Sequence, residues 1–155
     1  YYGRSQSGNN ERNVFNFQTR SVRSVYDALS EQQRRRAVVT GTPGEGARSV
    51  EFRRAGEARP GLGVADLSED QRRLVEQVMR DILAPFRRED TDEVMELIRR
   101  NGGFERINLA FYKEENAGAD ENERWHFWRL EGPGFVWNYR ILPHVHAYVN
   151  IARQA

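Results

Sequence analysis

The stretch "RWHFWRLEGPGFVWNYRILPHVHAYVNIA", residues 124–152, decides the fold. Apolar and polar residues alternate in three short runs, which is the period of half-buried β-strands. Residues 132–134, Gly-Pro-Gly, separate the first two runs, and residues 142–143, Leu-Pro, separate the last two. Such residues favour tight turns between strands. The stretch therefore predicts three antiparallel strands that follow one another as a meander.

The segments before this stretch predict a fourth strand and three helices. "RINLAFYKEE", residues 106–115, alternates in the same way and predicts the strand. Two similar segments, "LSEQQRRRAV" at 29–38 and "LSEDQRRLVEQV" at 67–78, each contain a Ser-x-x-Gln capping box and predict two helix starts. A third helix is expected to begin at Asp90 and to end before Gly102. Helices followed by an antiparallel meander sheet of about four strands define an α+β domain.

The apolar faces of these elements are expected to meet in one core. The helix that begins near Ser68 has a clear apolar stripe, which ends at Pro85. The predicted core between helices and sheet consists of Leu74, Val78, Ile82, Leu97, Ile98, Val145, Val149 and Ile151.

The chain of 155 residues has room for one domain, which we place at residues 26–155. Residues 1–25 are rich in Gly, Ser and Asn at their start and predict an extended N-terminal arm. Val14, Phe15 and Phe17 form a short β-prone apolar patch within it. We expect this patch to dock on the domain or on a neighbouring copy.

Composition excludes several classes of function. The net charge is +1, so no strong positive field attracts nucleic acid. There is no cysteine, which excludes thiolate metal sites and cysteine nucleophiles. No apolar run is long enough to span a membrane. Because the chain starts at Tyr1 without a methionine, we expect that an upstream segment was removed, by processing or by truncation. A lost signal peptide, which would make the protein extracytoplasmic or secreted, is one possibility.

The meander predicts a face that carries both aromatic and polar side chains. We expect Glu131 to lie opposite Phe135, and Tyr139 opposite His146, in a simple register. A mixed face of this kind is typical of a ligand-binding or partner-binding surface. The predicted face consists of Trp125, Arg129, Glu131, Trp137, Tyr139, Tyr148 and Asn150, together with His144 and His146. His126 falls on the opposite, apolar side.

His144 and His146 predict either a metal site or two stacked core histidines. Residues at i and i+2 of a strand point the same way, so both rings are available to one zinc or copper ion. A complete site needs three or four ligands, and the same face offers only Glu131 as a carboxylate. The alternative is that both rings pack among the neighbouring aromatic residues.

Three segments resemble the bacterial family Domain of Unknown Function 3500. They are "RPGLGVADLSEDQRRL" at 59–74, "FYKEE" at 111–115 and "RWHFWRLEG" at 124–132. "ALSEQQRRRAV" at 28–38 is similar to an earlier helix of the family. Two histidines typically follow the Glu-Gly of the family, whereas Pro133 and Gly134 follow it here. The resemblance implies an exported bacterial protein, and it carries no metal ligand onto a position of this chain.

Three functions fit these observations. The first is a non-enzymatic module that self-associates into an oligomer or polymer, or binds a partner, through the arm and the aromatic sheet face. The second is a metal-binding protein or metal-dependent enzyme centred on His144 and His146. The third is a small-ligand binder on the aromatic face. We favour them in this order.

Overall fold

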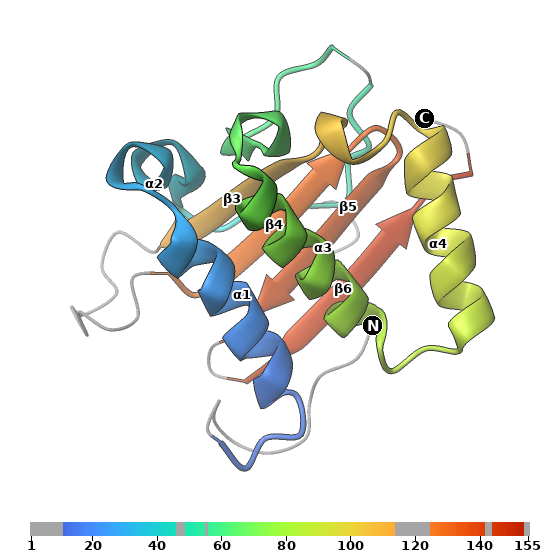
Figure 1. Ribbon diagram of the computed structural model, residues 1–155, viewed down its shortest axis with the longest axis horizontal. Helices are drawn as coiled ribbons and strands as arrows, with labels where there is room; N and C mark the ends of the chain where they lie inside the picture. Colours follow the sequence, from blue (N-terminus) through green and yellow to red (C-terminus); the bar gives the residue numbers. More distant parts are fainter. Residues whose placement is uncertain (1–10, 46–48, 55, 114–124, 142–143, 154–155) are drawn as a thin grey trace.

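The computed structural model describes residues 11–45, 49–54, 56–113, 125–141 and 144–153. Helices lie on one face of a mixed sheet, and Figure 1 views the molecule from the helix side. The helices are α1 (Asn16–Ala28), α2 (Glu31–Ala37), α3 (Glu69–Leu83) and α4 (Arg88–Arg100), with short 3-10 turns η2 (Val64–Asp66) and η3 (Phe104–Arg106). The strands are β1 (Val38–Thr40), β2 (Leu62–Gly63), β3 (Asn108–Lys113), β4 (Phe127–Gly132), β5 (Phe135–Arg140) and β6 (His146–Ile151). The predicted α+β class is confirmed.

The predicted meander forms most of the sheet. Strands β3, β4, β5 and β6 are neighbours in chain order, and each pair is antiparallel. Two strands that we did not predict complete it. β1 runs parallel to the end of β3, and β2 runs antiparallel to its start. They have three and two residues, too few to produce a visible alternation in the sequence.

The second half of the segment predicted as an extended arm is helical. Helix α1 begins at Asn16, and its buried face consists of Gln18, Thr19, Val22, Val25 and Tyr26. The spacing is that of a helix, but two of these five residues are polar, so hydrophobicity alone does not display the period. Gln18 donates to the carbonyl of Asp81 at 2.8 Å. The predicted boundary between residues 25 and 26 therefore falls inside a helix that packs on α3.

The core lies between the helices and the sheet. Val78, Ile82, Ile98 and Val145 are buried there as predicted. Leu74, Val149 and Ile151 are partly buried and pack against the core, and Leu97 is half-buried. The largest fully buried side chains come from the strands: Trp128, Trp137, Tyr139 and Phe111.

The predicted register between β4 and β5 is wrong by one residue. Gly132, not Glu131, lies opposite Phe135, so the hairpin loop has two residues, Pro133 and Gly134. Gly134 has a φ of 74°, which glycine adopts without strain in the second position of such a turn. A shift of one residue moves every side chain of a strand to the other face. The aromatic residues of β5 therefore face the helices.

The two similar capping boxes form one paired structure. Gln33 and Gln71 each accept a hydrogen bond from the backbone N–H of the serine that begins their helix, at 2.9 Å in both cases. Their side-chain amides also bond each other in both directions, at 3.0 and 2.9 Å. Each amide donates to a carbonyl just before the other helix, Gln33 to Asp66 and Gln71 to Ala28. The repeat in the sequence thus joins the starts of α2 and α3.

Candidate functional site

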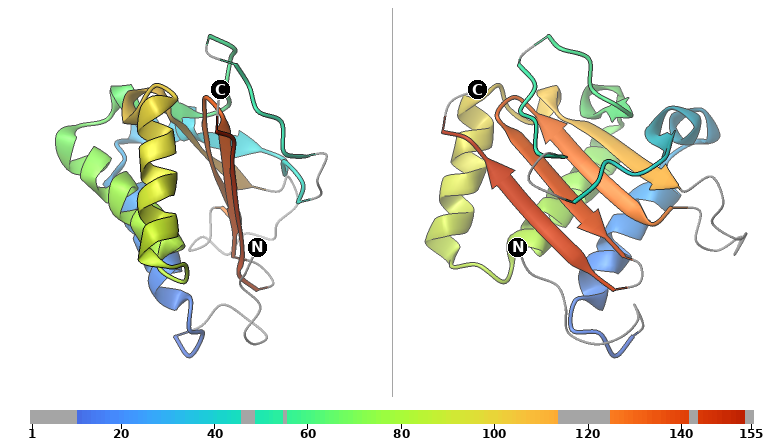
Figure 2. Two further views of the ribbon diagram at one scale, coloured as in Figure 1. Left: turned by 90° about the vertical axis from the view of Figure 1, so that its right-hand side faces the viewer. Right: turned by 180° about the vertical axis from the view of Figure 1, so that it is seen from behind.

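The sheet face opposite the helices is polar and covered. The segment from β1 to β2 crosses this face in the view from behind (Figure 2, right). We call its described residues, 41–45, 49–54 and 56–61, the strap. The cross-strand register places three rows of side chains on this face: Tyr112–Phe127–Arg140–His146, Ala110–Arg129–Asn138–Tyr148 and Asn108–Glu131–Val136–Asn150.

Three charged side chains meet beneath the strap. Glu131 is 3% exposed, and both of its carboxylate oxygens accept hydrogen bonds from Arg53 of the strap, at 2.6 and 2.7 Å. Arg129 lies 3.5 Å from the same carboxylate and donates to the carbonyl of Ser49. Burial raises the pKa of the neighbouring Tyr112 hydroxyl above its usual value, and the positive charge of Arg129 offsets part of this rise. Buried charges need such partners because leaving water is costly.

A pocket of about 490 Å³ lies between the strap and the sheet beside these charges. Its lining includes Tyr112, Arg129 and Glu131 from the sheet, and Thr42 and Arg53 from the strap. Pockets of this size bind small molecules in many proteins. A second hollow of about 520 Å³ between α2 and α3 is lined by the capping glutamines, which already bond each other. The pocket under the strap is therefore a better candidate for ligand binding than the hollow between α2 and α3.

Several buried polar atoms of this face and of the strap have no hydrogen-bond partner within the described part of the chain. They are Nε of Arg129, Oδ1 of Asn138, Nε of Arg140, Oε1 of Glu45 and Nε of Arg59. Arg129 and Asn138 are cross-strand neighbours in the middle row, and they are 6% and 2% exposed. A buried polar atom without a partner costs about 1–3 kcal/mol, so such atoms often mark the place of a bound molecule or water.

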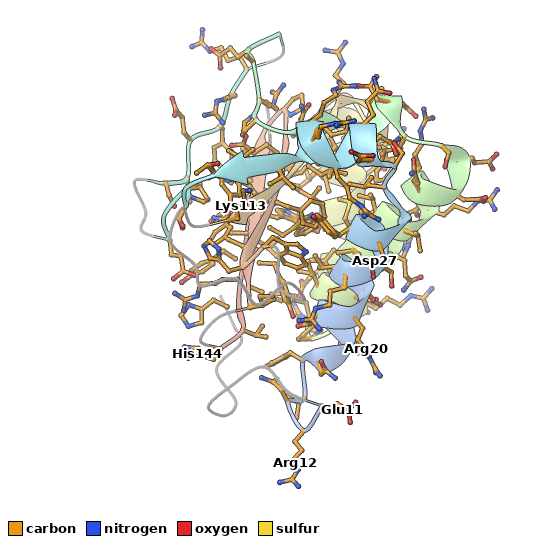
Figure 3. All side chains as sticks on the ribbon, turned by 90° about the vertical axis from the view of Figure 1, so that its left-hand side faces the viewer. Glu11, Arg12, Arg20, Asp27, Lys113 and His144 are labelled. Carbon is orange, nitrogen blue, oxygen red and sulfur yellow. The ribbon has the colours of Figure 1, made fainter. Side chains whose placement is uncertain are left out.

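A second polar cluster lies at the β6 end of the same face. Arg140 is 2.8 Å from the carboxylate of Glu45 and 2.7 Å from Nδ1 of His146. His144 and His146 approach each other through their Nε2 atoms, which are 2.7 Å apart. In Figure 3, His144 lies on the side of the molecule opposite α1, the helix that carries Arg20 and Asp27. Glu45 thus ties the strap to β5 and β6.

Arg140 disfavours a positive charge on His146. Burial, followed by the positive charge of Arg140, lowers the pKa of His146. The guanidinium of Arg140 lies 2.7 Å from Nδ1 and 3.1 Å from Nε2 of His146, and Oε2 of Glu45 lies 3.3 Å from Nδ1.

This arrangement opposes a metal ion at the histidine pair. A metal held between the two Nε2 atoms would lie close to the positive charge of Arg140, which is 3.1 Å from Nε2 of His146. Within the described residues, no group of three His, Cys, Asp or Glu side chains is arranged to hold a metal. His126 lies elsewhere, with Nε2 3.1 Å from the hydroxyl of Thr42. The zinc or copper site stays a prediction.

Arg140 makes the metal prediction testable. If the pair binds Zn²⁺ or Cu²⁺, Arg140→Met should strengthen binding, because it removes a nearby positive charge and frees His146. The melting temperature should then rise with added metal more in Arg140→Met than in the parent, and not at all in a His144→Ala/His146→Ala double variant. Thermal melts with each metal and with a chelator measure this. Equal responses in all three proteins would exclude the pair as the site.

The structure divides the predicted site residues between the two faces. Arg129, Glu131, Tyr148 and Asn150 lie on the polar face, as does His146. Trp125, Trp137 and Tyr139 belong instead to the core on the helix side, because of the register shift and a bend before β4. Of the predicted arm contacts, Phe15 packs against the core, while Val14 and Phe17 are 67% and 38% exposed.

Sequence reasoning missed the residues that complete the site. The predicted register put Trp137 and Tyr139 on the polar face, which left Asn138 and Arg140 out of the predicted site, although their polarity is a signal for the face away from the core. Arg53 and Glu45 lie in the strap, 78 and 101 positions from Glu131 and His146, their partners in the sheet. No local pattern in the sequence connects residues so far apart.

The fold and the site define an α+β domain with a polar sheet face roofed by a strap. The chain belongs to the family described as protein of unknown function (DUF3500), whose model matches residues 4–151. No curated protein and no solved structure matches the chain. None of the described helices is long and apolar enough to cross a membrane.

Proposed function

We propose that the polar sheet face binds a small polar molecule in the pocket beneath the strap. The observation that carries the proposal is a pocket of about 490 Å³ whose floor contains the charged residues Arg129 and Glu131, both less than a tenth exposed. Apolar side chains would stabilise a covered sheet face at lower cost than paired charges. A charged floor that is kept under a roof therefore favours recognition of a ligand over simple packing.

The arrangement of the strap supports the same function. Two ion pairs join the strap to the sheet. Arg53 of the strap binds Glu131 of β4, and Glu45 of the strap binds Arg140 of β5. A ligand between them is removed from water, which strengthens its polar contacts. Self-association through the aromatic face has less support than the sequence suggested, because Trp137 and Tyr139 lie in the core.

Narrowing the pocket should prevent binding. Thr40 is exposed at the end of β1 and lines the pocket, so Thr40→Trp should fill its mouth without disturbing the core. Compounds from a library of small polar molecules that bind in the pocket should raise the melting temperature of the parent and not of Thr40→Trp. Arg35→Trp, on the exposed side of α2, serves as the matched control. A compound that stabilises all three proteins equally binds elsewhere and contradicts the proposal.

Self-association, export and the absence of nucleic-acid binding stay predictions. Residues 1–10 of the proposed arm lie outside the described residues. Val14 and Phe17, which are exposed next to them, remain available for contact with a second copy.

A further inference from the structure

The charges beneath the strap do not balance. Arg53 and Arg129 carry two positive charges, and Glu131 carries one negative charge between them. Around them, exposed Glu51 lines the pocket, and Arg59, which is attracted to Glu131, also lies near Glu57 and Arg106. The two carboxylates offset the two further arginines. Among the described residues, the group is therefore left with an excess of one positive charge.

Arg129 is the less well-paired of the two central arginines. Arg53 occupies both oxygens of Glu131 at 2.6 and 2.7 Å, whereas Arg129 is 3.5 Å from one of them. Arg129 is also the more deeply buried, with its side chain 7% exposed against 29% for Arg53. Its Nε has no partner among the described residues. A buried guanidinium with an unused donor is a site for an acceptor that carries negative charge.

We propose that the ligand of this pocket is a monocarboxylate, held by Arg129. This inference rests on the proposed function. One carboxylate offsets the excess charge of the group, and its two oxygens match the flat fork of an arginine. A phosphate dianion exceeds that charge and would be repelled by Glu131 and Glu51. The carboxylate of a small acid and the carboxyl end of a peptide share this chemistry.

Calorimetric titration of the full chain at pH 7 tests the ligand class. The probes are benzoate, its neutral analogue benzamide, inorganic phosphate, and an acetylated tripeptide with a free or an amidated carboxyl end. We expect benzoate to bind at least about tenfold more tightly than benzamide, which has no negative charge for the buried arginine. We expect the same margin over phosphate, which carries more than one negative charge on average at pH 7 and is repelled by Glu131 and Glu51. If the tripeptide with a free carboxyl end binds and the amidated form does not, the pocket accepts the carboxyl end of a peptide. If neither form binds while benzoate does, the ligand is a small acid.

Two variants locate the bound carboxylate. Arg129→Met should weaken benzoate binding at least about tenfold, whereas Arg80→Met, on the exposed side of α3, should leave it unchanged. Glu131→Gln should have the opposite effect, because it removes the competing carboxylate and leaves Arg53 and Arg129 for the ligand. We expect severalfold tighter binding in this variant. A protein that was merely less stable would not gain affinity, so the two results separate recognition from folding.

The outcomes distinguish this inference from the proposed function. If benzamide binds as tightly as benzoate and Thr40→Trp abolishes both, the carboxylate class is wrong and the pocket remains a binding site. Tighter binding of phosphate, or weaker benzoate binding in Glu131→Gln, also overturns the carboxylate class. If no carboxylate binds while library compounds bind in the pocket, the inference fails and the proposed function stands. If no probe and no library compound binds, both fail.

Discussion

Replacing Val78 with aspartate is expected to unfold the domain. Val78 is fully buried in α3, where it belongs to the core between helices and sheet. An isolated carboxylate at this position would lose its hydration and gain no described positive partner, at a cost of several kcal/mol. The total stability of a domain of this size is about 5–15 kcal/mol. Circular dichroism at pH 7 should show loss of cooperative thermal unfolding.

The neighbouring residue provides the control for this prediction. Gln77 is exposed on the same helix and bonds Asp81 at 2.8 Å. Gln77→Asp introduces the same charge in water, loses this surface bond, and should cost about 1 kcal/mol. A Val78→Asp variant that melts like Gln77→Asp would show that α3 does not pack as described.

Gly61→Ala is expected to have the second-largest effect. Gly61 has a φ of 86°, and a Cβ atom at this position would lie 2.0 Å from the carbonyl oxygen of Leu109. The backbone would have to move, and the pairing of Leu62 with Leu109 would be lost. The displaced backbone and the strain of a positive φ should together destabilise the domain by about 3 kcal/mol or more. Urea unfolding followed by tryptophan fluorescence measures this.

Gly63→Ala is the matched control, two residues further along the chain. Its Cβ would lie 3.8 Å from the nearest atom, a side-chain oxygen of Asp66, which is an ordinary contact. The two variants change the same residue type on either side of Leu62, and we expect a clear difference in their urea midpoints. Equal midpoints would mean that the close approach of Gly61 to β3 is not required for folding.

Local patterns predicted the elements that depend on local physics. The apolar stripe of α3 and both capping boxes are present because neighbours in a helix determine them. The meander is present because alternation and turn residues determine it. Helix α1 was missed because Gln18 and Thr19 occupy its buried face, where their hydrogen bonds to α3 and Tyr139 replace apolar contact.

The site was predicted only in part for a related reason. Two register errors of one residue, before and after β5, cancelled each other, so β4 and β6 were placed on the correct face and β5 was inverted. The composition of β5 contains the correct register. Burying its aromatic residues, Phe135, Trp137 and Tyr139, puts its polar residues, Asn138 and Arg140, on the opposite face. The contribution of the strap depends on contacts across the chain, which no local pattern encodes.

The paired glutamines at the starts of α2 and α3 allow the length of the strap to vary. Gln33 and Gln71 are 38 positions apart, and their mutual hydrogen bonds close the chain around the whole strap at its base. Once the ends of a loop are fixed, doubling its length costs only about 0.6 kcal/mol of further entropy. Insertions in the roof that leave Arg53 and Glu45 in place are therefore inexpensive, while the floor on the sheet stays fixed. A scaffold of this kind can acquire a new ligand by altering one loop.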